Sequence, residues 1–221
     1  MQPALPNRDE RVEDFGGLSI HWDHRVLRPR LWTVEQALWA AKVGRELPAG
    51  PVLELFCGAG HIGLLAASRL GRDVVQVDTN PAAVEFARRN AAEAGVRADV
   101  RERPVAAALE PDELFPLVIA DPPWVAHERV DSFPDDPPAA IDGGSDGTEK
   151  IALAVAVGTR HLHPDGHLFV QVGDAGQAEV VRDLVDRAGP GPARAVVEVR
   201  DCLPGGVVVQ VGPARTGRDV G

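Results

Sequence analysis

The residues best suited to chemistry lie in the stretch 118–124, where an apolar run ends in Asp121, two prolines and Trp124. Each proline fixes the backbone φ angle and removes an N–H donor, so the neighbouring carbonyl groups are held in fixed directions. The stretch therefore offers a carboxylate, the carbonyl oxygen of Pro122 and a flat aromatic face. These groups suit a planar NH2 group, whose hydrogens would bond to the two acceptors while its π-system stacks on Trp124. The structural alternative is a rigid turn after a buried strand.

A glycine-rich turn is the second sign of chemistry. The mostly apolar run 51–57 opens into Gly58, Gly60 and Gly63, and the next strand-like run ends at Asp78. Glycines in such a turn let backbone N–H groups approach a ligand closely, because no side chain stands in the way. The pattern predicts a nucleotide site. It also satisfies the dinucleotide signature, with Asp78 near the place of the ribose-binding acid, so an NAD-dependent oxidoreductase is an alternative.

Three features favour a sulfonium methyl donor over NAD. Glu54 lies inside the first strand, where an ammonium and a sulfonium charge would need an anion but a pyrophosphate would not. The runs 195–200 and 207–211 are joined by six residues, too few for a crossover helix, so they must pair antiparallel, whereas the dinucleotide fold ends parallel. Finally, the stretch 121–124 follows a strand at the carboxyl edge of the sheet, where ligands of such folds bind.

The elements that position these residues alternate between strand and helix. Strands are predicted at 15–22, 51–57, 73–78, 98–103, 116–120 and 167–172, and helices at 33–47, 61–70, 81–95, 147–162 and 175–188. A capping box of Thr33 and Gln36 is expected to begin the first helix, and Asn80 with Pro81 to begin the third. The alternation predicts an α/β fold with right-handed βαβ units. We expect a doubly wound sheet of about seven strands, mostly parallel, with an antiparallel C-terminal strand.

Composition limits the classes of partner. The formal net charge is −10 and the pI is near 5.1, so nucleic acid is a disfavoured partner because the protein's field repels phosphate. No apolar run approaches the length of a membrane span and the N-terminus has no signal-peptide core, so we expect a cytoplasmic protein with no membrane contact. The two cysteines and seven histidines lack the spacing of metal ligands, and no metal site is predicted.

At these motifs the chain resembles the class I S-adenosylmethionine-dependent methyltransferases that carry an (Asp/Asn)-Pro-Pro-aromatic motif. It is most similar to the release-factor (protein) glutamine N5-methyltransferase family. Four matches carry the resemblance: Phe15–Leu18 with Pro29, Arg30 and Thr33; Glu54–Gly63; Asp121–Trp124; and Gly143–Gly147. The glycine motif is common to the superfamily, whereas a Gly-Gly-x-Asp-Gly block after Asp-Pro-Pro-Trp is much more specific. The resemblance covers about residues 15–212 and implies the Rossmann-like class I methyltransferase fold.

The chain also departs from that family. Its members usually have Asn and Tyr where this chain has Asp121 and Trp124, and Asp at the first place is more familiar in nucleic-acid amino-methyltransferases. Bacterial members carry an N-terminal helical domain that grips the release factor, and the residues before Val52 are too few for it. The stretch 103–105 lacks the acid often found after the third strand, so no adenine-contacting residue is assigned.

The resemblance implies a cofactor, S-adenosyl-L-methionine, and a set of site residues. Catalysis would fall to Asp121, Pro122 and Trp124. Cofactor binding would fall to Glu54, Phe56, Gly58, Gly60, Gly63, Asp78, Thr79 and Asp121. In this scheme Glu54 faces the methionine amino end of the cofactor, and Asp78 accepts both ribose hydroxyls.

We therefore expect an S-adenosylmethionine-dependent N-methyltransferase acting on a planar amide or amino nitrogen, with a protein glutamine as the first candidate acceptor. The alternatives are a small-molecule N-methyltransferase, a nucleic-acid exocyclic-amine methyltransferase, the NAD-dependent oxidoreductase and a non-catalytic scaffold. A small activator subunit or a homodimer partner is expected beside the protein or small-molecule acceptor. The acidic, proline-rich segment 125–141 is expected to form a substrate lip, with a mobile surface loop as the alternative.

The length of 221 residues fits one α/β domain. We expect residues 1–50 to form an N-terminal strand and helix that cover the pocket, with residues 1–14 frayed. Residues 51–212 would form the methyltransferase domain, and residues 213–221 a disordered tail.

Overall fold

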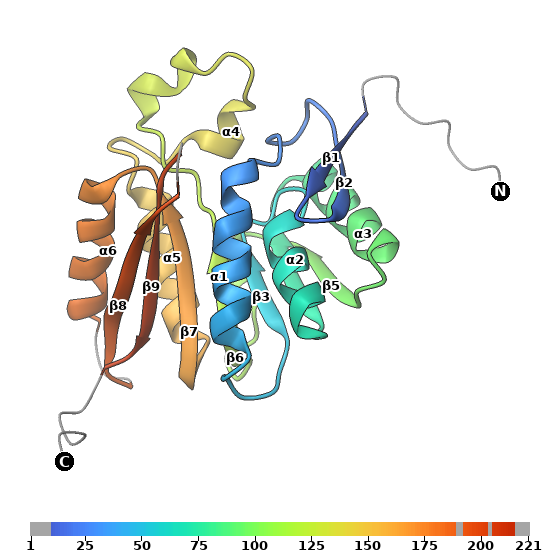
Figure 1. Ribbon diagram of the computed structural model, residues 1–221. Coiled ribbons are helices and arrows are strands. Elements are labelled where there is room, and N and C mark those ends of the chain that lie inside the picture. The colour runs from blue at the N-terminus through green and yellow to red at the C-terminus, as the bar shows by residue number, and fades with distance from the viewer. Residues whose placement is uncertain (1–9, 189–191, 203–204, 215–221) are drawn as a thin grey trace.

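A seven-stranded sheet organises the chain, and its strands lie in the order β5-β4-β3-β6-β7-β9-β8 (Figure 1). The computed structural model describes residues 10–188, 192–202 and 205–214. The strands are β3 (Val52–Leu55), β4 (Val74–Asp78), β5 (Ala98–Glu102), β6 (Phe115–Ala120), β7 (Leu162–Val172), β8 (Arg194–Asp201) and β9 (Val207–Pro213). Neighbours from β5 to β7 pair in parallel, whereas β9 pairs antiparallel with both β7 and β8. The predicted α/β sheet, mostly parallel with an antiparallel C-terminal strand, is confirmed.

Helices cover both faces of this sheet (Figure 1). One face carries α1 (Val34–Gly44), α2 (His61–Leu70) and α3 (Pro81–Glu93), and the other carries α5 (Glu149–Arg160) and α6 (Ala175–Asp186). Shorter elements are η1 (Leu31–Thr33), η2 (Val105–Ala107), η3 (His127–Ser132) and α4 (Pro138–Ile141). Strands β3 and β6 are buried along their whole length, as parallel strands are when helices cover both faces. The core therefore lies on both sides of the two strands whose ends carry the motifs.

Local signals set the ends of the helices as expected. The Asn80 side chain accepts a hydrogen bond from the Ala82 amide at 2.9 Å, and Pro81 is the first helical residue of α3. At α2, Gly71 closes the helix in the left-handed conformation that glycine adopts without strain. These caps orient α2 and α3 so that both begin beside the carboxyl ends of the strands.

The start of α1 differs from the prediction. Thr33 and Gln36 do not form a capping box, because η1 precedes α1 and the Thr33 hydroxyl donates to the Arg30 carbonyl oxygen at 2.7 Å. The fully buried Gln36 side chain instead donates to the Ala120 and Phe169 carbonyl oxygens at 3.1 and 3.3 Å. The helix is thus joined to β6 and β7 at the edge where the motif 121–124 begins.

The N-terminal segment is a hairpin rather than one strand. β1 (Arg11–Phe15) pairs antiparallel with β2 (Leu18–Trp22), and Gly16 and Gly17 form the turn with positive φ angles. Residues 11–14 are therefore in a strand, and the prediction that they fray is wrong. The Asn90 side chain accepts from the His21 amide and donates to the His21 carbonyl oxygen, which holds the hairpin against α3.

The C-terminal boundary differs by one residue, because Pro213 still belongs to β9. Of the rest of the predicted tail, Ala214 is described and follows β9, whereas residues 215–221 lie outside the described residues, as do residues 1–9. Among the helices that the structure describes, none has the length and apolar character that crossing a membrane requires.

Candidate active site

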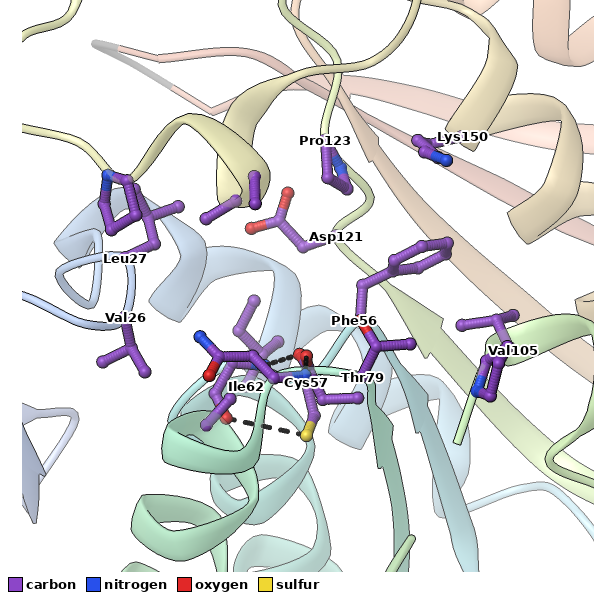
Figure 2. A pocket seen from close by; sticks show the side chains of 18 of the residues that line it. Val26, Leu27, Phe56, Cys57, Ile62, Thr79, Val105, Asp121, Pro123 and Lys150 are labelled. Carbon is purple, nitrogen blue, oxygen red and sulfur yellow. Dashed lines mark hydrogen bonds between the residues drawn. The ribbon is translucent and has the colours of Figure 1, made fainter. Parts of the chain in front are cut away.

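The first chamber is a cavity of about 410 Å³ at the carboxyl ends of β3, β4 and β6, where the strand order reverses (Figure 2). This reversal is the place where open α/β sheets bind their ligands. Five predicted cofactor residues line the chamber: Phe56, Gly58, Asp78, Thr79 and Asp121. The structure therefore brings together residues that follow three different strands.

The loop after β3 presents bare backbone to this chamber. No protein atom lies within 4 Å of the position that a Cβ at Gly58 would take. At Gly60, by contrast, a Cβ would lie 2.6 Å from Nε2 of Gln76, so this glycine permits close packing inside the protein. Phe56 has a φ angle of 58°, the left-handed region that a side chain disfavours. The loop geometry thus leaves open space over Gly58, as a bulky ligand would require.

Asp78 ends β4 and its carboxylate is held by backbone amides. Oδ2 accepts from the Gly58 amide and Oδ1 from the Asn80 amide, each at 2.8 Å. Burial raises the pKa of Asp78, and these hydrogen bonds to its charged form oppose the shift. Each oxygen retains acceptor capacity for a ligand hydroxyl, because an ionised carboxylate has about four lone-pair sites.

Glu54 is buried and does not line the first chamber, nor do Gly60 and Gly63. Its carboxylate accepts a hydrogen bond from Nε2 of Gln76 at 2.6 Å, and from the amides of Ile62 and Gly63 at the beginning of α2. Burial raises the pKa of Glu54 to about 7, and these hydrogen bonds oppose the shift. The negative charge of Asp121 raises it further.

Gly63 explains how Glu54 fits beside α2. A Cβ at Gly63 would lie 2.6 Å from Oε2 of Glu54, so only a glycine lets the carboxylate reach the first turn of the helix. The Glu54 carboxylate lies at the helix N-terminus, where backbone amides favour an anion, and its contact with the methionine end of a cofactor stays a prediction. Glu54 therefore positions the glycine loop from behind.

The second chamber is a cavity of about 240 Å³ beside the first. Its wall includes the two remaining motif residues, Pro122 and Trp124. Four residues line both chambers: Leu27, Asp121, Pro123 and Ala140. Polar and aromatic side chains complete the wall: Arg30, Trp32, Phe133, Asp136 and Gln171. The two cavities are thus adjacent, with Asp121 on their common boundary.

The Asp121 carboxylate has no hydrogen-bond partner in the described part of the chain, and in Figure 2 it projects into the first chamber. Burial raises its pKa to about 7, while the positive charge of Arg30 opposes this shift. A carboxylate without a hydrogen-bond partner is a strong acceptor for an N–H group or a cation. Asp121 is therefore available to bind such a group at the boundary of the two chambers.

Backbone packing holds the rest of the motif rigidly. A Cβ at Gly143 would lie 2.8 Å from the Pro123 carbonyl oxygen, and one at Gly147 would lie 2.5 Å from the Trp124 carbonyl oxygen. Nε2 of Gln177 donates to the same Trp124 oxygen at 2.8 Å. The Gly-Gly-x-Asp-Gly block therefore supports the motif by close approach, which explains its glycines in physical terms.

The segment 125–141, which we call the lip, lines both chambers through residues that include Pro137 and Phe133. Nη2 of Arg30 donates to both carboxylate oxygens of Asp136 at 2.6 and 2.5 Å. This ion pair joins the lip to the segment before α1. The lip thus forms part of the wall of both chambers, and its role toward a substrate stays a prediction.

Sequence reasoning missed several residues that line the first chamber. They are Arg25, Val26, Pro104, Val105, Lys150 and Leu153. Val105, which follows β5, lines the same chamber as Phe56 (Figure 2). The topology could have predicted Pro104 and Val105, because residues that directly follow β5 must lie at the same carboxyl edge of the sheet as the motifs. Among the described residues, no group of three or more His, Cys, Asp and Glu side chains is placed to hold a metal ion.

Comparison of the sequence with known proteins shows which family the chain is similar to. Residues 37–133 match the family model of the methyltransferase small domain. The chain is 34% identical over 190 residues to a release factor glutamine methyltransferase from Geobacter sulfurreducens, covering 80% of this chain and 63% of that protein. It is 31% identical to the enzyme of that name from Cereibacter sphaeroides, covering 85% of this chain and 71% of that protein. A ribosomal protein uL3 glutamine methyltransferase from Bradyrhizobium diazoefficiens is 32% identical, and the chain covers 57% of its length.

Solved structures agree with the fold. A ribosomal protein L11 methylase from Lactobacillus delbrueckii subsp. bulgaricus has a TM-score of 0.62 at 13% identity, with 87% of this chain and 84% of that chain covered. A putative S-adenosylmethionine-dependent methyltransferase from Streptococcus mutans has a TM-score of 0.65 at 10% identity, with 96% and 57% covered. At such low identity these likenesses show the fold alone. The chain spans 57–63% of the length of the first curated relatives that it matches.

Proposed function

Because the chain belongs to the family of the release factor glutamine methyltransferases, we propose that it transfers a methyl group from S-adenosylmethionine to the side-chain amide nitrogen of a protein glutamine. One observation carries this proposal: the two chambers share Asp121 and Pro123 on their walls. The methyl group of a donor in the first chamber and the nitrogen of an amide in the second would lie next to each other beside the Asp121 carboxylate. Such positioning can lower the barrier by about 7 to 11 kcal/mol.

The first chamber fits the cofactor. The open space over Gly58 admits a bulky ligand, and the Asp78 carboxylate retains acceptor capacity for the two ribose hydroxyls. The apolar side chains of Phe56 and Val105 would flank the adenine ring. Glu54 would contribute its charge, which favours a bound ammonium and sulfonium, and would hold the glycine loop in place.

When bound, S-adenosylmethionine supplies a methyl group on a sulfonium sulfur, which leaves as a neutral thioether with the electron pair of the broken carbon–sulfur bond. An amide nitrogen is a poor nucleophile because its lone pair is delocalised. Asp121 and the Pro122 carbonyl oxygen would accept its two hydrogens, and Trp124 would hold the group flat. As the new nitrogen–carbon bond forms, one N–H proton passes to the Asp121 carboxylate, which offsets the positive charge on nitrogen.

A small-molecule N-methyltransferase is the second candidate. The observation that favours it is the carboxylate at Asp121. A carboxylate suits an amine as methyl acceptor better than an asparagine side chain at this position would, because it offsets the positive charge that develops on the amine nitrogen. Nucleic acid is disfavoured by the net charge of −10, and NAD by the antiparallel strand β9. A cytoplasmic location, and a small activator subunit or homodimer partner, stand as predictions from the sequence.

Labelled-methyl transfer tests the proposal. The acceptors are a Gly-Gly-Gln peptide, oligonucleotides and a metabolite extract, and we expect label in the peptide. Asp121→Ala should lower transfer by at least 100-fold, because the nitrogen loses both its proton acceptor and the hydrogen bond that holds it in place. Asp135→Ala, which removes an exposed carboxylate of the lip, is the matched control.

Calorimetry separates catalysis from cofactor binding. S-adenosylhomocysteine should bind and NAD should not. The Asp121→Ala variant should keep nearly all of its affinity for S-adenosylhomocysteine, because that ligand carries no sulfonium charge. Equal loss of transfer and of affinity would contradict the role given to Asp121, and label in oligonucleotides or metabolites alone would contradict the glutamine acceptor.

A further inference from the structure

Arg30 stands on the wall of the second chamber with donors to spare. Only its Nη2 is engaged, by the two oxygens of Asp136, and no other hydrogen bond from its guanidinium to the described residues is made. The guanidinium carbon lies 5.5 Å from the centre of the Trp32 ring, which restrains its orientation. A guanidinium has five N–H donors, so Nε and Nη1 are available to a ligand.

Acceptors and donors both line the second chamber. The Asp121 carboxylate and the Pro122 carbonyl oxygen are acceptors without a hydrogen-bond partner within the described ranges, and the Asp136 carboxylate is an acceptor that Arg30 already holds. The donors are the indole N–H groups of Trp32 and Trp124 and the Arg30 guanidinium, and of these only Arg30 carries a charge.

A primary amide matches this arrangement and an amine does not. An amide has two N–H hydrogens for the acceptors and one carbonyl oxygen that needs a donor. An alkylammonium has three hydrogens and no acceptor, and it would lie in the field of the Arg30 charge. That field reaches the reacting end of the chamber, since it opposes the rise in the pKa of Asp121.

Resting on the proposed function, we propose that Arg30 is a catalytic residue that donates a hydrogen bond to the carbonyl oxygen of the acceptor glutamine. As the nitrogen–carbon bond forms and the carbon–sulfur bond of the donor breaks, the N–H proton passes to the Asp121 carboxylate, so the product amide is neutral. The guanidinium lies where it can hold the carbonyl oxygen, and with it the plane of the amide, in a fixed orientation toward the methyl donor. Asp136 then serves to hold Arg30 in place, and the residue selects amides over amines of equal length.

The test compares Arg30→Gln with Asp136→Asn on two peptides that differ at one residue. The first contains glutamine, and the second contains ornithine, whose side chain has the same length but lacks the carbonyl oxygen. We expect Arg30→Gln to lower kcat on the glutamine peptide by about 100-fold, because an amide that loses the hydrogen bond to its carbonyl oxygen is misaligned for transfer. Asp136→Asn breaks the same ion pair but keeps the guanidinium, so its loss should stay below about tenfold.

Two further readouts separate this role from a structural one. The wild-type protein should prefer the glutamine peptide, and Arg30→Gln should narrow or reverse that preference. Calorimetry in the presence of S-adenosylhomocysteine should show weaker binding of the glutamine peptide to Arg30→Gln than to Asp136→Asn. Thermal unfolding checks both variants, and Arg30→Lys, which keeps the charge, replaces Arg30→Gln if the latter does not fold.

The outcomes are distinct. Equal losses for Arg30→Gln and Asp136→Asn, with the glutamine preference kept, would show that Arg30 only anchors the lip and would overturn this inference alone. Activity of Arg30→Gln at the wild-type level would overturn it as well. If the wild-type protein methylates no glutamine peptide, or only the ornithine peptide, the proposed function itself fails.

Discussion

Replacing Asp121 by asparagine tests whether the ionised carboxylate drives methyl transfer. Asparagine keeps the shape and one acceptor oxygen but cannot take a proton. In the wild-type protein the pKa of Asp121 is raised to about 7 by burial, so its ionised fraction is about one half at pH 7. At pH 6 that fraction falls to about one eleventh, a fivefold drop in active enzyme. Below pH 6 the rate should fall tenfold per unit.

The rate of the Asp121→Asn variant should not fall as the pH drops below 7. A charge-assisted hydrogen bond is roughly twice as strong as a neutral one, which corresponds to about tenfold in rate. Asp121→Asn should therefore be about tenfold slower than the wild-type protein at pH 8, and the two profiles should cross near pH 6. The assay is labelled-methyl transfer to the glutamine peptide under single-turnover conditions between pH 5.5 and 8.5.

Stability supplies an independent readout of the same group. Because the folded pKa of Asp121 lies above its ordinary value of 3.8, the folded state holds the proton that the unfolded chain has already released. The free energy of unfolding should therefore fall as pH rises from about 4 to 7. Asp121→Asn also removes the negative charge that raises the pKa of Glu54, so the difference between wild type and variant in urea unfolding reports on Asp121 together with its coupling to Glu54. A variant with the wild-type pH limb, or a wild-type rate that is flat down to pH 5.5, would refute this reasoning.

Two more substitutions test the first chamber. Asp78→Asn should weaken binding of S-adenosylhomocysteine in calorimetry by more than tenfold, because an amide offers the ribose hydroxyls fewer acceptors. The control is Asp73→Asn, the same change at an exposed residue, which should leave the affinity unaltered. Equal affinities of the two variants for S-adenosylhomocysteine would contradict the assignment of Asp78. Gly63→Ala should lower the free energy of unfolding in urea by about 1–3 kcal/mol, because its Cβ would lie 2.6 Å from Oε2 of Glu54. A loss below about 0.5 kcal/mol would show that the buried carboxylate can move aside.

Short-range patterns were enough to predict the sheet. The apolar runs that end at Asp78 and Asp121 became β4 and β6 because the residues in them are buried on both faces. The helix that begins at Asn80 followed from its cap, which depends only on a side chain and an amide two residues away. Such local signals survive any tertiary arrangement, so the sequence can carry them alone.

Local patterns failed where distant segments compete for the same side chain. The expected capping box at Gln36 did not form, because its side-chain amide donates instead to the carbonyl oxygens of Ala120 and Phe169. The turn at Gly16 was read as part of one strand, although its positive φ angle reverses the chain. Hydrophobic periodicity indicates neither the distant hydrogen-bond partners of Gln36 nor the positive φ angle of Gly16, so it could not predict either result.

The amino-acid sequence by itself determined which chemical groups the site can use and that they lie at the carboxyl edge of the sheet. It could do so because strand ends and glycine turns depend on neighbouring residues. Only the tertiary structure decided how these groups are shared between two cavities. It placed Glu54 behind the glycine loop, and it joined Arg30 to Asp136 across 106 positions of sequence. Contacts of that separation depend on how the helices and the lip pack on the sheet, and no local pattern encodes their distance.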